Sequence, residues 1–142
     1  MELDFDWFNL HVGALVGTAL VFGGMSFFAF VFTPMVFKFV EREDAAHFLR
    51  QVFPVYHRVI ASLSCVPAIL LIPGGRSYTP EVTALLAVAL LNLVSARFIV
   101  PAADAAREAG DQKKFAAIHR LSVILHTGEL VAMLVVLIRL AQ

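Results

Sequence analysis

The sequence predicts an all-α fold, an integral membrane four-helix bundle with up-down-up-down topology, in a single domain over residues 1–142. Hydrophobic residues make up 60% of the chain and charged residues 15%, whereas soluble domains contain about 45–50% and about 25%. Four apolar runs are each long enough to cross a hydrocarbon core of about 30 Å, which takes about 20 helical residues. The connections between the runs are short, so consecutive helices should be antiparallel.

The four runs define the expected elements in chain order. The first covers about residues 8–39 and exceeds one crossing, so we expect it to tilt or to extend beyond the bilayer. The second covers about residues 48–72 and stops at a Pro-Gly-Gly sequence, which is a turn signal. The third covers about residues 80–100 and stops at Pro101, and the fourth covers about residues 115–140.

Two similar stretches indicate that the bundle consists of two repeated helical hairpins. PVYHRVIAS ends at Ser62 and AAIHRLSVI ends at Ile124, and each has a His-Arg pair near the start of an apolar run. Each pair follows an apolar end, a proline, a charged connection and a phenylalanine. In a parallel repeat, His57 and His119 would occupy equivalent positions on the second and fourth helices.

The basic residues lie mainly on one side of the predicted membrane. Nine of the eleven Lys and Arg residues flank the first and third connections, and only Arg76 and Arg139 lie on the other side. The nine are Lys38, Arg42, Arg50, Arg58, Arg97, Arg107, Lys113, Lys114 and Arg120. The positive-inside rule then predicts a bacterial inner (plasma) membrane protein with both termini outside and the connections between helices 1 and 2 and between helices 3 and 4 in the cytoplasm.

The N-terminal segment supports a retained anchor. Glu2, Asp4 and Asp6 precede the first run without any Lys or Arg, whereas a secretory signal peptide begins with a basic stretch. The first run is also longer than the apolar part of a signal peptide. We therefore expect the first helix to remain in the protein.

Several function classes are disfavoured by the sequence. The formal net charge is +0, so no basic field indicates a nucleic-acid partner. Cys65 is the only cysteine, which excludes an intrachain disulfide or a CxxC motif. The chain contains no Gly-rich phosphate loop, nucleophile elbow or HExxH, so no catalytic residue is predicted and an enzyme is not indicated.

Ionisable side chains inside the predicted spans are the candidate functional residues, because a charge in the hydrocarbon core costs several kcal/mol unless it is paired. His119, His126 and Glu129 project within one broad face of the fourth helix, and His57 lies at a comparable depth on the second. A buried Glu129 should be protonated or paired with a histidine or an arginine.

Two imidazoles at one depth on different helices are what a bis-histidine haem b requires, and imidazole is also a common ligand of transition metals. Arginines near the cytoplasmic ends of the spans could hold the haem propionates, or could reach lipid head groups. The predicted cofactor-binding residues are His57, His119, His126, Arg58, Arg97 and Arg120, and the predicted metal ligands are His57, His119, His126 and Glu129. Histidines that only form hydrogen bonds between helices are an equally good interpretation.

The order of FFAFVFTPMVF, VFPVYHRV and ARFIVPAADAAREAGDQKKFAAIHRLSVIL resembles the bacterial domain-of-unknown-function family grouped with transmembrane protein 205, over nearly the whole chain. The residues that fit the pattern are Asn92, Arg97, Pro101, Arg107, His119 and Arg120. The resemblance implies a four-helix membrane protein without an assigned enzymatic activity. It also implies a loose architectural kinship with copper-resistance membrane proteins and bacterial protoporphyrinogen oxidase. His57 and His126 depart from the pattern.

Three functions therefore remain open. The first is a haem b- or transition-metal-binding bundle with a redox or cofactor-handling role. The second is a non-catalytic accessory or structural subunit of a larger membrane complex. The third is a metal or small-solute transporter or efflux factor, which with so few helices would need to form a homo-oligomer. In all three the lipid bilayer is the surrounding partner.

Overall fold

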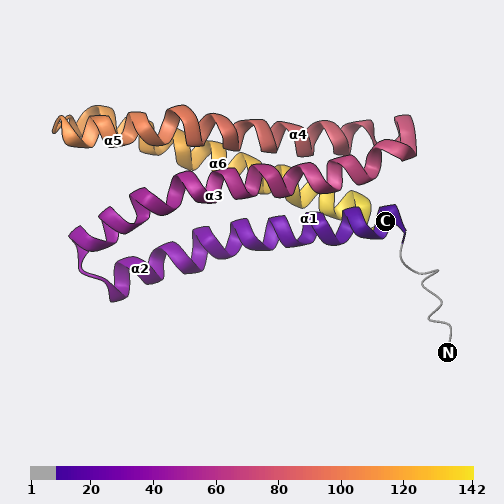
Figure 1. The fold of residues 1–142 in the computed structure, drawn as a ribbon, viewed down its shortest axis with the longest axis horizontal. Helices are drawn as coiled ribbons and strands as arrows, with labels where there is room; N and C mark the ends of the chain where they lie inside the picture. The colour runs from indigo at the N-terminus through magenta and orange to yellow at the C-terminus, as the bar shows by residue number, and fades with distance from the viewer. Residues whose placement is uncertain (1–8) are drawn as a thin grey trace.

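The computed structural model describes residues 9–142, and within this range the chain is helical without a β-strand, as the sequence predicts. The elements in chain order are α1 (Leu10–Phe27), η1 (Phe28–Phe32), α2 (Thr33–Phe39), α3 (Arg42–Leu71), η2 (Ile72–Tyr78), α4 (Thr79–Val94), η3 (Ser95–Ile99), α5 (Val100–Glu108) and α6 (Gln112–Leu140). α1 continues into α2 and α4 continues into α5 as long rods (Figure 1). The acidic residues Glu2, Asp4 and Asp6 and the first residue of the first predicted run lie outside the described residues.

Three helical stretches are long and apolar enough to cross a membrane, and they cover Leu10–Phe39, Arg42–Glu108 and Gln112–Leu140. The second stretch folds back on itself at η2, where Gly75 has φ 67°. Glycine adopts this left-handed region without steric cost. The fold-back lays α4 along α3, as Figure 1 shows. The helix lengths and compositions thus fit a membrane protein.

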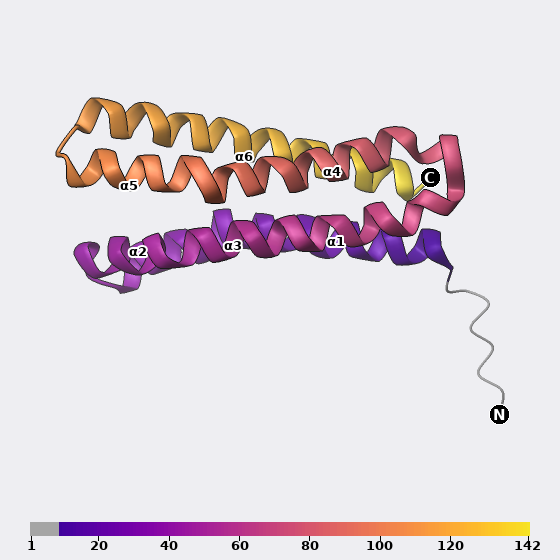
Figure 2. The ribbon, with the colours of Figure 1, turned by 45° about the horizontal axis from the view of Figure 1, so that its top comes forward.

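The helices pack through small and flexible side chains. α3 contacts both α1 and α4, and α6 contacts both α1 and α4 (Figure 2). The buried side chains between them include Ala14, Met25, Leu85 and Met133. Many large apolar side chains face outward instead, among them Leu20, Phe30, Ile69, Leu90 and Ile124. An apolar exterior of this extent is typical of a protein surrounded by lipid.

The helix of the third run does not stop at Pro101, as we expected, but continues to Glu108. A proline inside a helix removes one backbone N–H and clashes with the preceding turn. The π-helical turn η3 directly precedes this site, and a wider turn relieves that clash. The first run repeats the arrangement, because the π-helical turn η1 precedes Pro34. The two halves therefore share the order of a rod, a π turn, a proline and a short helix.

The hairpin of α2 with α3 and the hairpin of α5 with α6 diverge at one end of the molecule (Figure 2). α1 contacts α6, but within residues 9–142 α2 does not contact α6. The connections at this end are short, since α3 begins at Arg42 and α6 begins at Gln112. We call it the basic end, because most of the Lys and Arg residues lie there.

The opposite end is closed by side-chain contacts between helices. The Tyr78 hydroxyl lies 3.0 Å from Nδ1 of His11, and Nε2 of His11 lies 2.8 Å from the carbonyl oxygen of Leu140. Glu81, in the first turn of α4, accepts a hydrogen bond from Arg139 in the last turn of α6. These contacts hold α1, η2, α4 and α6 together where the chain turns back.

Removing Arg139 from its ion pair with Glu81 should cost more stability than removing Glu81. The Glu81 side chain is 4% exposed, whereas the Arg139 side chain is 53% exposed. Arg139→Ala should cost about 3–5 kcal/mol, because it leaves a buried carboxylate unpaired. Glu81→Ala should cost about 1 kcal/mol or less, because the remaining guanidinium reaches solvent. Thermal unfolding of the detergent-solubilised variants, followed by circular dichroism, measures both. Equal losses of stability would contradict this assignment, and the double variant should be less damaged than Arg139→Ala alone.

Candidate functional site

His57 is held in one orientation by a buried hydrogen bond to α4. His57 is 6% exposed, and its Nδ1 lies 2.8 Å from Oδ1 of Asn92. Nδ2 of Asn92 donates to the carbonyl oxygen of Val88 at 3.0 Å, which orients the amide so that Oδ1 is the acceptor. Nδ1 of His57 must then carry the proton, and the lone pair of its Nε2 stays free. Metal-binding histidines are oriented by hydrogen bonds of this kind.

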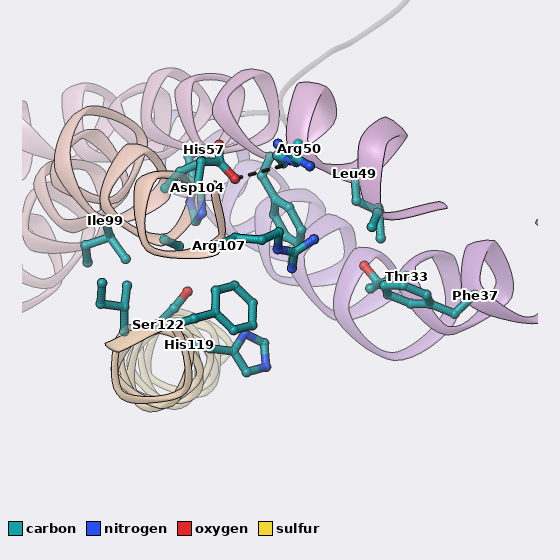
Figure 3. A pocket seen from close by; sticks show the side chains of 16 residues that line it. Thr33, Phe37, Leu49, Arg50, His57, Ile99, Asp104, Arg107, His119 and Ser122 are labelled. Atoms are coloured by element: carbon teal, nitrogen blue, oxygen red, sulfur yellow. Dashed lines mark ion pairs between the residues drawn. The ribbon is translucent and has the colours of Figure 1, made fainter. Parts of the chain in front are cut away.

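A pocket lies between the two hairpins at the basic end, and His57 lines it from α3 (Figure 3). His119 and Ser122 line it from α6, and Thr33 lines it from α2. Its apolar walls come from all the neighbouring helices and include Phe37, Phe53, Ile99, Val100, Phe115 and Ile118. A second hollow shares Arg107, Phe115 and His119 and continues to Arg42 and Gln112, near the connections of the basic end.

Two arginines and one aspartate supply the charges of the pocket. Nε of Arg50 lies 3.9 Å from Oδ1 of Asp104 (Figure 3). Nη1 of Arg50 lies 3.4 Å from Oε1 of Glu108. These contacts join α3 to α5 across one wall. The guanidinium of Arg107 lies 4.5 Å from the centroid of the Phe115 ring, a cation–π contact. Arg50 is thus engaged by carboxylates of α5, and Arg107 carries the other positive charge of this wall.

The structure separates several residues that the sequence analysis grouped together. Arg58, Arg97 and Arg120 are exposed, and none of them lines the pocket among the described residues. Arg58 lies beside Ser62 in a groove on the outer face of α3, and the Arg97 guanidinium is 5.6 Å from the Phe98 ring centroid. Positions at the surface suit contact with lipid head groups, the alternative role predicted for these arginines.

The proposed equivalence of His57 and His119 does not extend to their surroundings. His57 is buried and bonded to Asn92, whereas His119 is exposed and stacks on Phe115 with ring centroids 6.0 Å apart. Both nevertheless line the same pocket.

His126 and Glu129 belong to a second polar group, deeper in the helices. Nδ1 of His126 lies 3.5 Å from Oε2 of Glu129, so the buried carboxyl has one of the partners expected for it. The ring of Tyr56 contacts the rings of both His57 and His126, with centroids 5.2 Å and 6.1 Å apart. Tyr56 also stacks on Phe28, with ring centroids 3.9 Å apart. We call Tyr56, His57, Asn92, His126 and Glu129 the buried cluster.

These residues are not arranged to coordinate a bare metal ion. Within residues 9–142 no group of three or more His, Cys, Asp or Glu side chains is placed to hold a metal ion. The predicted ligands are divided instead, with His57 and His119 at the pocket and His126 and Glu129 in the buried cluster.

Sequence reasoning missed Asp104 and Arg107 as pocket residues, because it ended the third helix at Pro101, and it also missed Arg50. Once the helix continues, Val100, Asp104 and Arg107 recur at intervals of four and three residues and share one face. The helical spacing of these residues, read through the proline, was the available signal. No comparable sequence signal indicates Arg50, because its role depends on how closely α3 approaches α5.

These features define an all-helical protein with apolar outer faces and three stretches able to span a membrane. The family model described as a domain of unknown function, DUF4149, matches residues 16–112, and the chain belongs to this family. The match includes His57, Asn92, Asp104 and Arg107 and ends where α6 begins. No curated protein and no solved structure matches the chain.

Substitutions at His57 and at Asn92 should have non-additive effects on stability, because the two side chains form a buried hydrogen bond. Asn92→Leu leaves the buried Nδ1–H of His57 without its acceptor and should cost about 1–3 kcal/mol. Adding His57→Phe removes the stranded donor, so the double variant should lose less stability than the two single variants together. Thermal unfolding in detergent measures this coupling, with Ser62→Ala on the exposed face of α3 as a near-neutral control. Strict additivity of the two losses would contradict the assignment.

Proposed function

We propose that the chain is an integral inner-membrane protein that binds haem b in the pocket between its hairpins and has a redox or cofactor-handling role. The observation that carries the proposal is that His57 and His119, from α3 and α6, line one largely apolar pocket. Haem iron commonly takes histidine as an axial ligand, and the porphyrin supplies its other nitrogen ligands. Haem therefore suits a site with two histidines better than a bare metal ion, which needs more protein ligands.

The residues of the pocket have separate roles in this proposal. His57 presents Nε2, because Asn92 holds its Nδ1–H, and His119 approaches from the opposite hairpin. The phenylalanine side chains that line the pocket provide an apolar environment for a planar ring system. Arg107 replaces Arg58, Arg97 and Arg120 as the group that would bind a propionate, because it lines the pocket. Arg50 also lines the pocket but is paired with Asp104 and Glu108. Bound haem b would supply one-electron chemistry.

In the membrane, we propose four crossings, made by α1 with α2, by α3, by α4 with α5 and by α6. The fold-back at η2 supports this number, because it divides the longest apolar stretch into two antiparallel rods. The concentration of Lys and Arg at the basic end supports a cytoplasmic location for that end and an outside location for both termini.

The haem proposal predicts a coloured protein. Protein purified in detergent from haem-replete cells should show a Soret absorption band and contain iron by elemental analysis. His57→Ala should abolish the band, and Arg107→Ala should lower the haem-to-protein ratio several-fold. His47→Ala is the matched control and should leave the band unchanged, because His47 is exposed on the same helix and its hydrogen bond is to Gln51.

A colourless and metal-free preparation would overturn the haem proposal. A full Soret band in His57→Ala would overturn it as well. If such a preparation carried a stoichiometric protein partner, the accessory-subunit function would be favoured instead. A metal-containing but haem-free protein would favour the transport function.

The proposed orientation can be tested with single cysteines. In a Cys65→Ala background, Ser77→Cys lies in η2 and Gln112→Cys lies at the start of α6. In intact spheroplasts, a membrane-impermeant maleimide should label Ser77→Cys, because η2 should face the outside. Gln112→Cys should be labelled only after the membrane is permeabilised. The reverse pattern would overturn the orientation, and labelling of both in intact spheroplasts would overturn the number of crossings.

A further inference from the structure

The hollow beside the pocket brings together two arginines from different hairpins. Arg42 is the first residue of α3, and Arg107 lies in the last turn of α5. Gln112 and His119 of α6 also line the hollow, and within residues 9–142 no Asp or Glu lines it. Its polar lining therefore consists of two guanidinium groups, an amide and an imidazole.

The charges of these two arginines are not neutralised by the chain in the way that the charge of Arg50 is. In the described part of the chain Arg42 and Arg107 form no ion pair, whereas Arg50 is paired with carboxylates of α5. The acidic residues that follow Arg42, Glu43 and Asp44, lie in the exposed first turn of α3 and do not line the hollow. Two guanidinium groups in one hollow can bind an anion from outside the chain.

The hollow and the pocket form one continuous space. Arg107 and His119 line both of them (Figure 3), and so do Phe37 and Phe115. From these shared residues the pocket continues between largely apolar walls as far as His57. One end of the space is therefore positively charged, and the remainder is mainly apolar.

The two ends of this space lie at different depths in the proposed membrane. A hydrocarbon core of about 30 Å takes about 20 helical residues. Counted from the end that contains η2, the far boundary of the core falls near Gln51, Ile99 and Arg120. His57 then lies inside the core, whereas Arg42 and Arg107 lie about 12–14 Å beyond its boundary, at 1.5 Å per residue.

An amphipathic anion matches this arrangement. Its apolar body gains free energy by leaving water for the pocket, and its charged group avoids the cost of entering the hydrocarbon core. In the hollow the charged group meets guanidinium groups, which bind carboxylates through charge-assisted hydrogen bonds.

We propose that Arg42 and Arg107 form an anion site for an amphipathic carboxylate, whose apolar body lies in the pocket and whose charged end points toward the basic end. This inference rests on the proposed pocket and membrane position, and it names the class of ligand. It does not require iron or ligation by a histidine. It also gives Arg42, which does not line the pocket itself, a part in binding.

Metal-free protoporphyrin IX and its dimethyl ester test the anion site separately from iron ligation. Both have the same apolar ring, but the ester carries no carboxylate. With the full chain in lipid nanodiscs, porphyrin fluorescence measures the two dissociation constants, and empty nanodiscs give the background of partition into lipid. The acid should bind about tenfold or more tightly than the ester, because hydrogen bonds to charged groups contribute more than neutral ones.

Substitutions then assign this preference to the hollow. Arg42→Gln should weaken binding of the acid several-fold and leave binding of the ester unchanged, whereas Arg42→Lys should retain part of the preference because it keeps the charge. Arg42 is exposed, so these variants should fold. Arg58→Gln is the matched control, because Arg58 is also an exposed arginine of α3 but lines a separate groove. It should change neither dissociation constant.

Equal binding of the acid and the ester would overturn the proposal, and so would an equal loss for both ligands in Arg42→Gln. If neither porphyrin binds above the background, a fluorescent long-chain fatty acid and its methyl ester replace them. A preference for the fatty acid that depends on Arg42 would support the anion site and assign it to a lipid-derived carboxylate, and no binding of either acid would overturn the site. A protein purified without haem that still prefers the free acids would contradict only the haem proposal.

Discussion

The hydrogen bond from Nδ1 of His57 to Asn92 joins α3 to α4 at the place where the pocket and the buried cluster meet. It fixes the ring in one tautomer, so that the remaining nitrogen is a free acceptor. The bond also pairs two polar side chains that would be costly to bury separately. Without it, neither the wall of the pocket nor the edge of the cluster would have a defined chemistry.

Side-chain contacts hold the helices together at one end of the molecule, whereas at the basic end the hairpins diverge. At the end that contains η2, His11 and the pair of Glu81 with Arg139 tie the helices together. At the basic end α2 and α6 are apart, and the main polar link is that of Arg50 with α5. The pocket lies at the divergent end.

The sequence was sufficient for the helical class and for two buried ionisable residues, His57 and Glu129, because these depend on composition and spacing. It did not single out Glu81, which is 3% exposed. It failed at Pro101, where the local rule that a proline ends a helix is overridden by the π turn before it. It could not assign Arg50 to the pocket, because the residue acts through α5, which is distant in the sequence. It also gave His119 and His57 similar surroundings, although burial depends on which face of each helix meets a neighbour.

The position of His57 has a thermodynamic consequence for the proposed function. His57 lines the pocket, and its ring also contacts Tyr56, which in turn contacts His126. A ligand bound at Nε2 would therefore act on the packing of Tyr56 and His126, and a change in that packing would act on the ligand by the same amount, because linkage between two sites is reciprocal. A histidine that faced only the pocket could hold a ligand without this coupling. The contact of His57 with Tyr56 is thus what connects the pocket with the buried cluster.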